Sequence, residues 1–291
     1  MRVLIIVENN FVPVDRRVWG EATSLRDTGW KVSVICPAPR GAHAGHNSEN
    51  YSLKPFIENV DGITIYRFPL TFAEHGAMDF LKEYLHAFMS ITGLTWKVWR
   101  KEGFDIVHIC NPPEIFFPLG LFYKMLGSKF LFDHHDLLPE MINWRFKGFN
   151  KWFFHLFARI TEYLTYKIAD KIITTNQSYK EIAIKRNKVK PDKICIVRNG
   201  PKVHEFTPVN PDPSLRKNFP HVACYVGIMG EDDGVSELVE VIKHIIQDLK
   251  RTDILFILVG DGSDLPLVKQ KVADYGLDEF VDMPGDRKSV V

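Results

Sequence analysis

The sequence predicts an α/β protein made of two doubly wound units, of which the second is incomplete. Short apolar runs alternate with helix-like segments along most of the 291 residues, as expected for parallel strands connected by crossover helices. Several runs are apolar on both alternating faces, which is typical of strands covered by helices on both sides. A proline-rich stretch near residue 210 interrupts the alternation, and a strand, a loop and a helix follow it.

The expected strands follow one another in two groups, separated by the proline-rich stretch. In the first group they cover residues 2–7, 31–36, 63–68, 105–110, 129–133, 171–175 and 193–197. In the second they cover residues 223–227, 254–260 and 280–283. Two intervening helices are well marked, because apolar residues recur at helical spacing over residues 16–27 and 235–249.

The domain boundaries expected from this pattern are 1–206 for the first domain and 221–285 for a partial second one. The stretch between them, residues 207–220, holds four prolines and is read as a linker. An open parallel sheet rarely stands on two or three strands. The final six residues, DRKSVV at 286–291, match a common sequencing-adapter read translated in one frame. We therefore expect the native chain to continue past Gly285, with a natural charged tail as the alternative.

Composition excludes several classes of protein. The formal net charge of +1 leaves no bulk electrostatic footprint for nucleic acid. The four cysteines form no C-x-x-C pair, so a zinc site is not expected and a reducing compartment fits best. No run approaches the roughly 18 apolar residues of a membrane span, and the N-terminal apolar run is too short for a signal peptide. A cytoplasmic protein without a metal or cofactor is expected.

The loop after the first strand is the first candidate binding element, because doubly wound sheets bind ligands beyond the carboxyl ends of their strands. Asp15 is placed to cap a helix that opens with Arg16 and Arg17. Two arginines at a helix start oppose its dipole. This misfit suggests a bound anion, although a solvated basic turn accounts for it equally well.

The loop after the fourth strand is the second candidate. Two prolines fix this loop, HICNPPE, so that Asn111 and Glu114 can face a ligand. His108 falls inside the strand pattern and is read as a core histidine.

The next strand ends in the most titratable stretch of the chain, KFLFDHHDLLPE. His134 and His135 point to opposite faces if the strand continues, so at most one of them faces a cleft. A neutral histidine there could accept a proton near neutral pH, with Asp136 or Glu140 orienting it. We favour a ligand-binding edge over a plain polar turn.

The second domain opens with a strand, a glycine-containing loop and a helix, YVGIMGEDDGVSEL. Gly227 and Gly230 allow close approach of the backbone, and the helix N-terminus can hold a phosphate. The following strand ends in Gly260, Asp261 and Gly262, a second glycine-containing edge. The first loop is not a strict G-x-G-x-x-G, and no P-loop is present.

Together these loops resemble the retaining, nucleotide-sugar-dependent glycosyltransferases of family 4. The resemblance rests on DRRVWGEATSLRDTGWKVSVICP (15–37), FDIVHICNPPE (104–114), FDHHDLLPE (132–140), IVRNG (196–200), YVGIMGEDDGV (225–235) and ILVGDGSDLPLV (257–268), in that order. It implies the GT-B fold, here a complete N-terminal Rossmann-like domain and the first part of a second Rossmann-like domain.

The resemblance also implies an activity and its residues. A sugar would pass from a nucleotide diphosphate-sugar to an acceptor hydroxyl with retention of configuration, without a bound metal. His135 and Asp136 would be catalytic. Acceptor-binding residues would be Asp15, Arg16, Arg17, Asn111, Glu114 and Glu140. Donor-binding residues would be Asn199, Gly200, Gly227, Gly230, Gly260, Asp261 and Gly262.

Two departures from the family pattern bear on activity. Where many relatives carry an arginine and a lysine that hold the diphosphate, this chain has Ile228 and Asp233. The family's glutamate-rich donor motif would lie beyond Gly285. We therefore expect the chain as given to be inactive and the complete protein to be an enzyme. A non-catalytic nucleotide- or sugar-binding module and a GT-B sugar-nucleotide epimerase remain alternatives.

Residues 143–167 are unusually aromatic and interspersed with basic side chains. One helical face would hold Trp152, Phe153, Leu156, Phe157, Ile160, Tyr163 and Leu164. Such a helix can lie on an anionic membrane surface or pack in a core with its basic groups reaching out; both readings stay open. Similar enzymes often use lipid-linked acceptors in surface polysaccharide or glycolipid assembly, so we expect peripheral contact with the inner face of a membrane.

Overall fold

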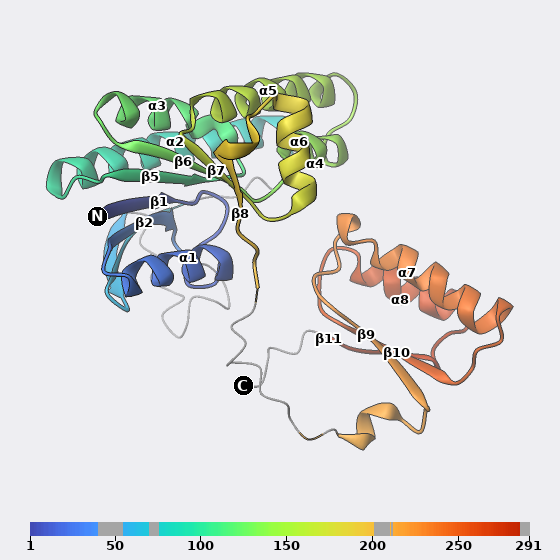
Figure 1. Cartoon of the computed structure of the whole chain (residues 1–291). Helices are drawn as coiled ribbons and strands as arrows, with labels where there is room; N and C mark the ends of the chain where they lie inside the picture. The colour runs from blue at the N-terminus through green and yellow to red at the C-terminus, as the bar shows by residue number, and fades with distance from the viewer. Residues whose placement is uncertain (40–54, 70–75, 201–209, 211, 286–291) are drawn as a thin grey trace. The chain divides into compact units, whose positions relative to one another are not determined.

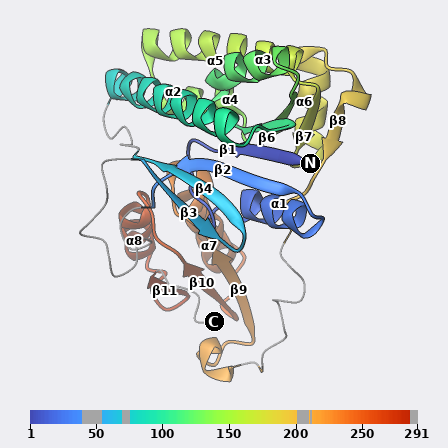
Figure 2. The same cartoon turned by 90° about the vertical axis from the view of Figure 1, so that its left-hand side faces the viewer.

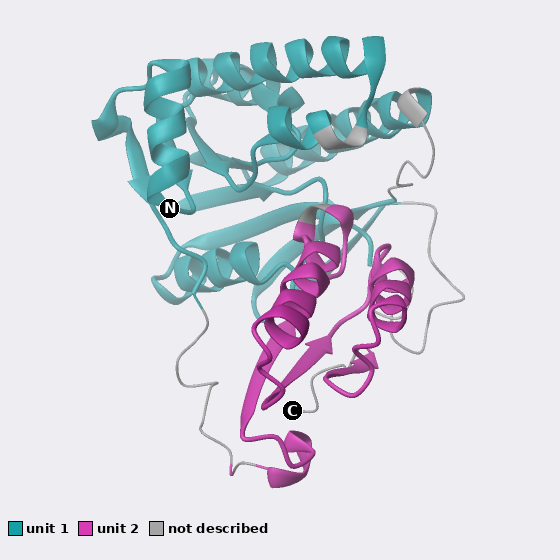
Figure 3. Cartoon of the chain, turned by 90° about the vertical axis from the view of Figure 1, so that its right-hand side faces the viewer, with its two compact units in different colours: residues 1–201 teal, residues 202–291 magenta. Residues whose placement is uncertain are grey.

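The computed structural model describes residues 1–39, 55–69, 76–200, 210 and 212–285. The chain divides into two compact units, Met1–Pro201 and Lys202–Val291 (Figure 3). The predicted tail, 286–291, and residues 207–209 and 211 of the predicted linker lie outside the described residues; within the linker, Pro213–Arg216 form a 3-10 turn.

The first unit is built on an eight-stranded sheet with the order β3-β4-β2-β1-β5-β6-β7-β8. Its strands are β1 (Arg2–Ile6), β2 (Lys31–Pro37), β3 (Phe56–Val60), β4 (Ile63–Phe68), β5 (Ile106–Cys110), β6 (Lys129–His134), β7 (Lys171–Thr174) and β8 (Ile194–Ile196). Its helices are α1 (Arg16–Asp27), α2 (Gly76–Lys101), α3 (Phe117–Met125), α4 (Leu138–Arg145), α5 (Gly148–Ile168) and α6 (Gln177–Asn187). All neighbouring strands are parallel except β3 and β4.

The strand order reverses between β1 and β5. The chain builds outward from β1 through β2 to β4, and then returns to place β5 on the other side of β1. The loops that follow β1 and β5 therefore leave the sheet in opposite directions. A crevice between such loops is the usual ligand site of an open α/β sheet.

Helices cover both faces of this sheet, with α1 on one face and α2, α3 and α5 on the other (Figures 1 and 2). The alternation of β1 explains how both faces are buried. Leu4 and Ile6 join the larger apolar cluster, whereas Val3 and Ile5 join the cluster that packs against α1. The predicted α/β class with a parallel sheet is confirmed.

The sequence did not predict β3, which pairs antiparallel with β4 at the edge of the sheet. Two of its five residues, Glu58 and Asn59, are polar and none of the five is fully buried, so no apolar run marks this strand. The turn between the strands is Asp61–Gly62, and both residues have left-handed φ values of 51° and 79°. An Asp-Gly pair is the usual signature of a tight hairpin turn, and it was the available signal.

The aromatic segment 143–167 is two helices, α4 and α5, separated at Phe146–Lys147. The predicted apolar face of α5 does not pack in the core. Its members are exposed, from 44% for Leu156 and Tyr163 to 60% for Trp152, except that Leu164 is half-buried. The alternative in which this face is a packed core surface is therefore wrong. None of the described helices has the length and apolar character needed to cross a bilayer.

The second unit is a three-stranded parallel sheet in the order β11-β10-β9. Its elements are β9 (His221–Val226), α7 (Val235–Lys243), β10 (Ile254–Val259), α8 (Leu265–Asp274) and β11 (Val281–Gly285). A π-helical turn, His244–Asp248, continues α7 to the end of the predicted helix. Both helices cover one side of the sheet (Figure 1), and their apolar residues form the core of this unit.

Candidate functional site

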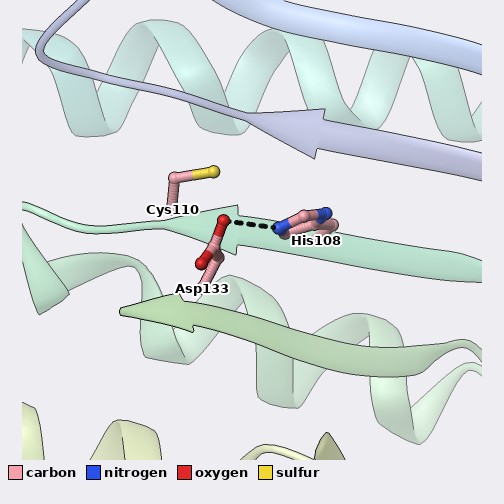
Figure 4. A group of neighbouring side chains, drawn as sticks. All are labelled: His108, Cys110 and Asp133. Carbon is pink, nitrogen blue, oxygen red and sulfur yellow. Dashed lines mark ion pairs between the residues drawn. The ribbon is translucent and has the colours of Figure 1, made fainter. Parts of the chain in front are cut away.

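A buried charged cluster lies at the carboxyl ends of β5 and β6, with the carboxylate of Asp133 at its centre. Asp133 is fully buried. Arg17 donates from Nη2 to Oδ1 at 2.7 Å and from Nε to Oδ2 at 3.3 Å. His135 Nε2 lies 2.7 Å from Oδ2. His108 Nε2 lies 3.4 Å from the same oxygen, the pair drawn in Figure 4.

Strand register and helix phase explain how these residues meet. Asp133 is paired with Cys110 at the ends of two neighbouring parallel strands. Asp15 caps α1 by accepting from the backbone N–H of Val18 at 3.0 Å, as the sequence predicted. That cap starts the helix so that Arg17 and Glu21, four residues apart, share the face toward the cluster and pair at 3.3 Å.

Charge within the cluster shifts the pKa of its members. Burial opposes ionisation of Asp133, but the adjacent imidazoles of His108 and His135 outweigh it and hold the pKa of Asp133 well below its usual range. Burial likewise opposes protonation of His135, but its hydrogen bond to Asp133 prevails and raises its pKa. The expected neutral base is therefore disfavoured, because Asp133 stabilises the imidazolium.

Glu21 adds a group that titrates near neutral pH. Burial raises the pKa of Glu21 to about 7, with His108 opposing the rise and the charge of Asp133 adding to it. Its Oε2 lies 3.7 Å from His108 Nε2. The charge of the cluster consequently changes in the physiological range.

Asn111 clamps the loop after β5 to the loop after β6. Its Oδ1 accepts from the backbone N–H groups of His135 and Asp136. Its Nδ2 donates to Glu114 Oε1 at 2.8 Å and to the Asp136 carbonyl at 2.6 Å. Asn111 is fully buried and its amide capacity is used within the protein. It positions the backbone of His135, and offers no free donor to a ligand.

Two further carboxyl groups lie buried just after β1 and β5. Burial raises the pKa of Glu114 to about 8, with the charge of Glu162 adding to the effect and Asn111 opposing it. Burial also raises the pKa of Glu8, directly after β1, to about 8, with Glu83 adding to it. Both side chains are therefore neutral at pH 7.

The other residues expected on this side lie apart from the cluster. Arg16 is exposed. Glu140 forms an ion pair with Arg186 and does not orient His135; that partner is Asp133. His134 is buried, with Nδ1 at 2.6 Å from the hydroxyl of Tyr166. Burial lowers the pKa of His134 to about 3, so it stays neutral.

His108, Cys110 and Asp133 each offer a possible metal-ligand atom, within 4.8 Å of one another (Figure 4). Both oxygens of Asp133 already accept hydrogen bonds, and the guanidinium of Arg17 supplies the positive charge that a cation would bring. Burial raises the pKa of the Cys110 thiol well above its usual value, whereas metals bind the thiolate. These residues fit an ion-pair cluster better than a metal site.

In the second unit, the two predicted donor loops lie against each other. Gly227 N–H donates to the Val259 carbonyl at 3.1 Å, and Met229 N–H donates to the Asp261 carbonyl at 3.0 Å. Gly260 has φ +149°, and a Cβ there would lie 1.8 Å from the Gly227 carbonyl oxygen. Only glycine allows the two backbones to come so close.

The positions that depart from the family pattern lie on the first of these loops. Ile228 is 71% exposed. Asp233 turns back and accepts from the backbone N–H of Gly230 at 2.8 Å. That contact occupies the backbone amide of Gly230.

Asn199 and Gly200 follow β8 and are exposed. The end of β8 is tied to the charged cluster, because Arg17 Nη1 donates to the Val197 carbonyl at 2.7 Å. Sequence analysis did not place Glu21 or His108 in a site, and it assigned no role to Asp133. The available signal for Asp133 was an acidic residue at the end of a buried strand. No sequence signal indicated that Arg17, 116 residues away, would contact it.

Comparison with known proteins gives a family match over residues 14–204, to the model of Glycosyltransferase Family 4. The chitobiosyldiphosphodolichol beta-mannosyltransferase of Candida glabrata is 23% identical over 205 residues, which is 69% of this chain and 42% of that protein. An Escherichia coli UDP-Gal:alpha-D-GlcNAc-diphosphoundecaprenol alpha-1,3-galactosyltransferase is 25% identical over 173 residues, 57% of this chain and 43% of the relative. The chain thus spans about two fifths of the length of these curated relatives.

Solved structures share the fold. Anabaena HepE in complex with UDP and glucose has a TM-score of 0.63 and 16% identity, covering 99% of this chain and 70% of HepE. A glycosyltransferase from Rickettsia africae has a TM-score of 0.61 and 18% identity, covering 99% of this chain and 69% of its own. These neighbours confirm the predicted GT-B class.

Proposed function

The chain belongs to Glycosyltransferase Family 4, and from that premise we propose that the complete protein transfers a sugar from a nucleotide diphosphate-sugar to an acceptor hydroxyl, with retention of configuration. The observation that carries the proposal is the buried Arg17–Asp133–His135 cluster at the carboxyl edge of the first sheet, beside the point where strand order reverses. Ligands of open α/β sheets bind at such points.

On the acceptor side, His135 is the group proposed to meet the substrate. Its Nε2 is held by Asp133 and its backbone N–H by Asn111, so Nδ1 is the ring atom that remains for a substrate oxygen. An imidazolium held in place can donate to an oxygen that gains negative charge during transfer, as a preorganised donor does. Asp136 follows it on the loop that Asn111 fixes. Asp15 and Asn111 would hold the loops that carry Arg17 and His135 in place. The remaining proposed acceptor-side groups are Arg16, Arg17, Glu114 and Glu140.

On the donor side, the proposal places the nucleotide diphosphate-sugar against the paired turns of the second unit. Gly227, Gly230 and the turn 260–262 would contact it, together with Asn199 and Gly200 from the end of the first unit. HepE is solved with UDP and with UDP-glucose, which supports this donor class. No metal or cofactor is proposed.

The acceptor is proposed to be lipid-linked. The names of three curated relatives each contain a lipid: diphosphodolichol, phosphatidylinositol and diphosphoundecaprenol. The exposed aromatic face of α5 and the basic residues beside it favour peripheral contact with an anionic membrane, on its cytoplasmic face, in polysaccharide or glycolipid assembly.

A direct experiment extends the sequence beyond Gly285 with its native codons and screens UDP-, GDP- and dTDP-sugars with lipid extracts. Release of nucleotide diphosphate coupled to a glycosylated lipid is expected with one donor, and NMR of the product should show the donor's anomeric configuration. The chain as given is expected to release none. No release from the extended protein with any combination would count against the proposal.

Membrane contact is tested by liposome flotation. Trp152→Glu together with Phe153→Glu should reduce flotation with anionic vesicles, since both side chains are exposed on α5. Equal flotation of the variant and the parent would count against a role for this face.

A non-catalytic nucleotide- or sugar-binding module is the second candidate. It is favoured by Asp233, which occupies the Gly230 amide, and by Ile228, which supplies no charge for a diphosphate. An epimerase gains no specific support from any observed contact. Binding of a UDP-sugar by the extended protein without turnover would favour the module.

A further inference from the structure

An apolar groove of about 440 Å³ runs between α2 and α5 in the first unit. One wall is formed by Leu81 and Leu85 of α2, and the other by Phe157 and Ile160 of α5. All four are exposed, between 46% and 61%. The volume falls within the range of small-molecule binding pockets, about 300–1,000 Å³. Exposed leucine, isoleucine and phenylalanine side chains gathered along one groove mark a binding surface.

The groove offers almost nothing for hydrogen bonding. Among the described residues that line it, only Tyr84 and Thr161 carry a polar side-chain atom. The hydroxyl of Thr161 already donates within α5, to the carbonyls of Phe157 and Ala158, each at 3.1 Å. A bound peptide would leave backbone N–H and C=O groups without partners, which is costly. Protein interfaces normally supply about one hydrogen bond per 100–200 Å². A hydrocarbon chain has no polar groups to satisfy.

The charges on α5 fit a lipid with an anionic headgroup. The charged side chains of this helix that reach solvent are all basic: Lys151, Arg159 and Lys167. Its one acid, Glu162, is fully buried and paired with Arg186 and Arg159. A groove that binds hydrocarbon beside a basic helix matches the chemistry of a phospholipid or lipid phosphate.

The groove adjoins the charged cluster along the chain. Ile115, one of its lining residues, directly follows the buried Glu114. Leu138, another, lies two residues after Asp136. A chain lying in the groove would therefore leave its polar end near the loops that follow β5 and β6.

We propose that the groove between α2 and α5 binds the hydrocarbon chain of the lipid-linked acceptor and so directs its polar end toward the His135 loop. This inference rests on the proposed function for the identity of the lipid. It assigns Phe157 and Ile160 of the α5 aromatic face to the hydrocarbon chain, beside the membrane contact proposed for Trp152 and Phe153.

The test uses alkyl phosphates as soluble probes, below their micelle concentrations, with binding measured by isothermal calorimetry. Butyl and octyl phosphate share a headgroup and differ only in chain length. Octyl phosphate should bind at least about tenfold more tightly than butyl phosphate. Full burial of each added methylene would strengthen binding by at most about fourfold. Leu85→Glu and, separately, Ile160→Glu should abolish this dependence on chain length; both positions are exposed, so folding should be retained and is checked by circular dichroism.

A matched control lies one turn further along α2. Met89 is 65% exposed but does not line the groove, so Met89→Glu should bind octyl phosphate like the parent. Equal binding of butyl and octyl phosphate, or equal losses in Leu85→Glu and Met89→Glu, would overturn the inference. So would a concentration-dependent dimer that Leu85→Glu dissociates, since a second copy would then occupy the groove.

The binding result and the transferase result can fail separately. If alkyl phosphates bind according to chain length but the extended protein transfers no sugar, the groove proposal stands and the proposed function is overturned. If the extended protein transfers sugar to a lipid acceptor and Leu85→Glu does not change that activity, the proposed function stands and the groove proposal is overturned.

Discussion

At the scale of single residues, Asp133 is the group on which the candidate site depends. It is fully buried and ionised, with a guanidinium on one side and two imidazoles on the other. Removing one partner from such a pair leaves an uncompensated charge in the interior. The contacts of Asp133 therefore hold the fold together as well as the site.

Arg17→Leu is expected to lower the free energy of unfolding by about 3–5 kcal/mol, because Asp133 would lose its bidentate partner. Arg16→Leu is the matched control, since Arg16 is exposed and such changes usually stay within about 0.5 kcal/mol. Urea unfolding followed by circular dichroism measures both. Similar losses in the two variants would mean that the buried pair contributes little.

His135→Ala should reduce kcat/KM of the extended protein by roughly 100-fold or more, the usual range for a group that exchanges or donates a proton. His155→Ala is the control, because His155 lies on α5 and bonds the Pro139 carbonyl. Near-normal turnover in His135→Ala would indicate that the KFLFDHHDLLPE stretch is a polar turn without a catalytic role.

The pH profile tests the protonation state of His135. Its pKa is raised by Asp133, so an activity that needs the imidazolium should be present at lower pH and fall as pH rises through that raised pKa. Asp133→Asn removes the negative charge and should move the fall to lower pH. An unchanged profile in a folded Asp133→Asn variant would contradict the pairing.

Glu114 makes stability depend on pH in a defined direction. Its pKa is about 8 when folded against 4.5 ordinarily, so the folded protein binds the extra proton between those values and its stability falls as pH rises from about 5 to 8. Glu114→Gln mimics the protonated side chain and should reduce this slope, the remainder coming from Glu8, whose pKa burial also raises to about 8. Each pKa unit is worth about 1.4 kcal/mol, so the expected change is on the order of a few kcal/mol. Thermal unfolding from pH 5 to 8 measures it, and parallel curves for parent and variant would contradict it.

At the scale of elements, the sequence predicted the helix of α5 but not the side on which it packs. The side that meets the rest of the unit is a stripe of Phe154, Ala158, Thr161 and Thr165, mostly small residues. The more aromatic side stays exposed. Periodicity measures where apolar residues gather, whereas packing also depends on how closely a helix can approach its neighbours. The strands were predicted more fully, because those of a doubly covered sheet are apolar on both faces.

Gly260→Ala tests the contact between the two glycine turns of the second unit. Its Cβ would lie 1.8 Å from the Gly227 carbonyl oxygen, so the turns must separate and this unit should lose about 2 kcal/mol or more. Gly276→Ala is the control; its φ is +62° but nothing lies within 4 Å, so only about 1 kcal/mol of strain is expected. Hydrogen exchange of β9 and β10 amides reports the difference. Equal protection in the two variants would mean that the close approach is not required.

At the scale of the whole molecule, each of the two units has apolar core clusters of its own among the described residues. Three clusters lie within the first unit and one within the second. The sequence predicted the two units because hydrophobic pattern and proline content are local signals. It could not predict which distant charges would meet, because Arg17 and Asp133 are joined only by the folded sheet.

Residues 1–200 alone should therefore fold. The thermal transition of this fragment should lie within about 2–4 °C of the transition of the first unit within the whole chain. A shift of that size is expected for a loss of about 1 kcal/mol in a domain of this size. Calorimetry of the fragment and of the whole chain provides the comparison. A fragment without a cooperative transition would show that the first unit needs the second.

The hydrogen bond from Arg17 to the Val197 carbonyl has a mechanical consequence. Val197 lies just after β8, close to the end of the first unit at Pro201, so this last described part of the unit is anchored by the same guanidinium that binds Asp133. A change that separates Arg17 from Asp133 is therefore expected to free the backbone at Val197 as well.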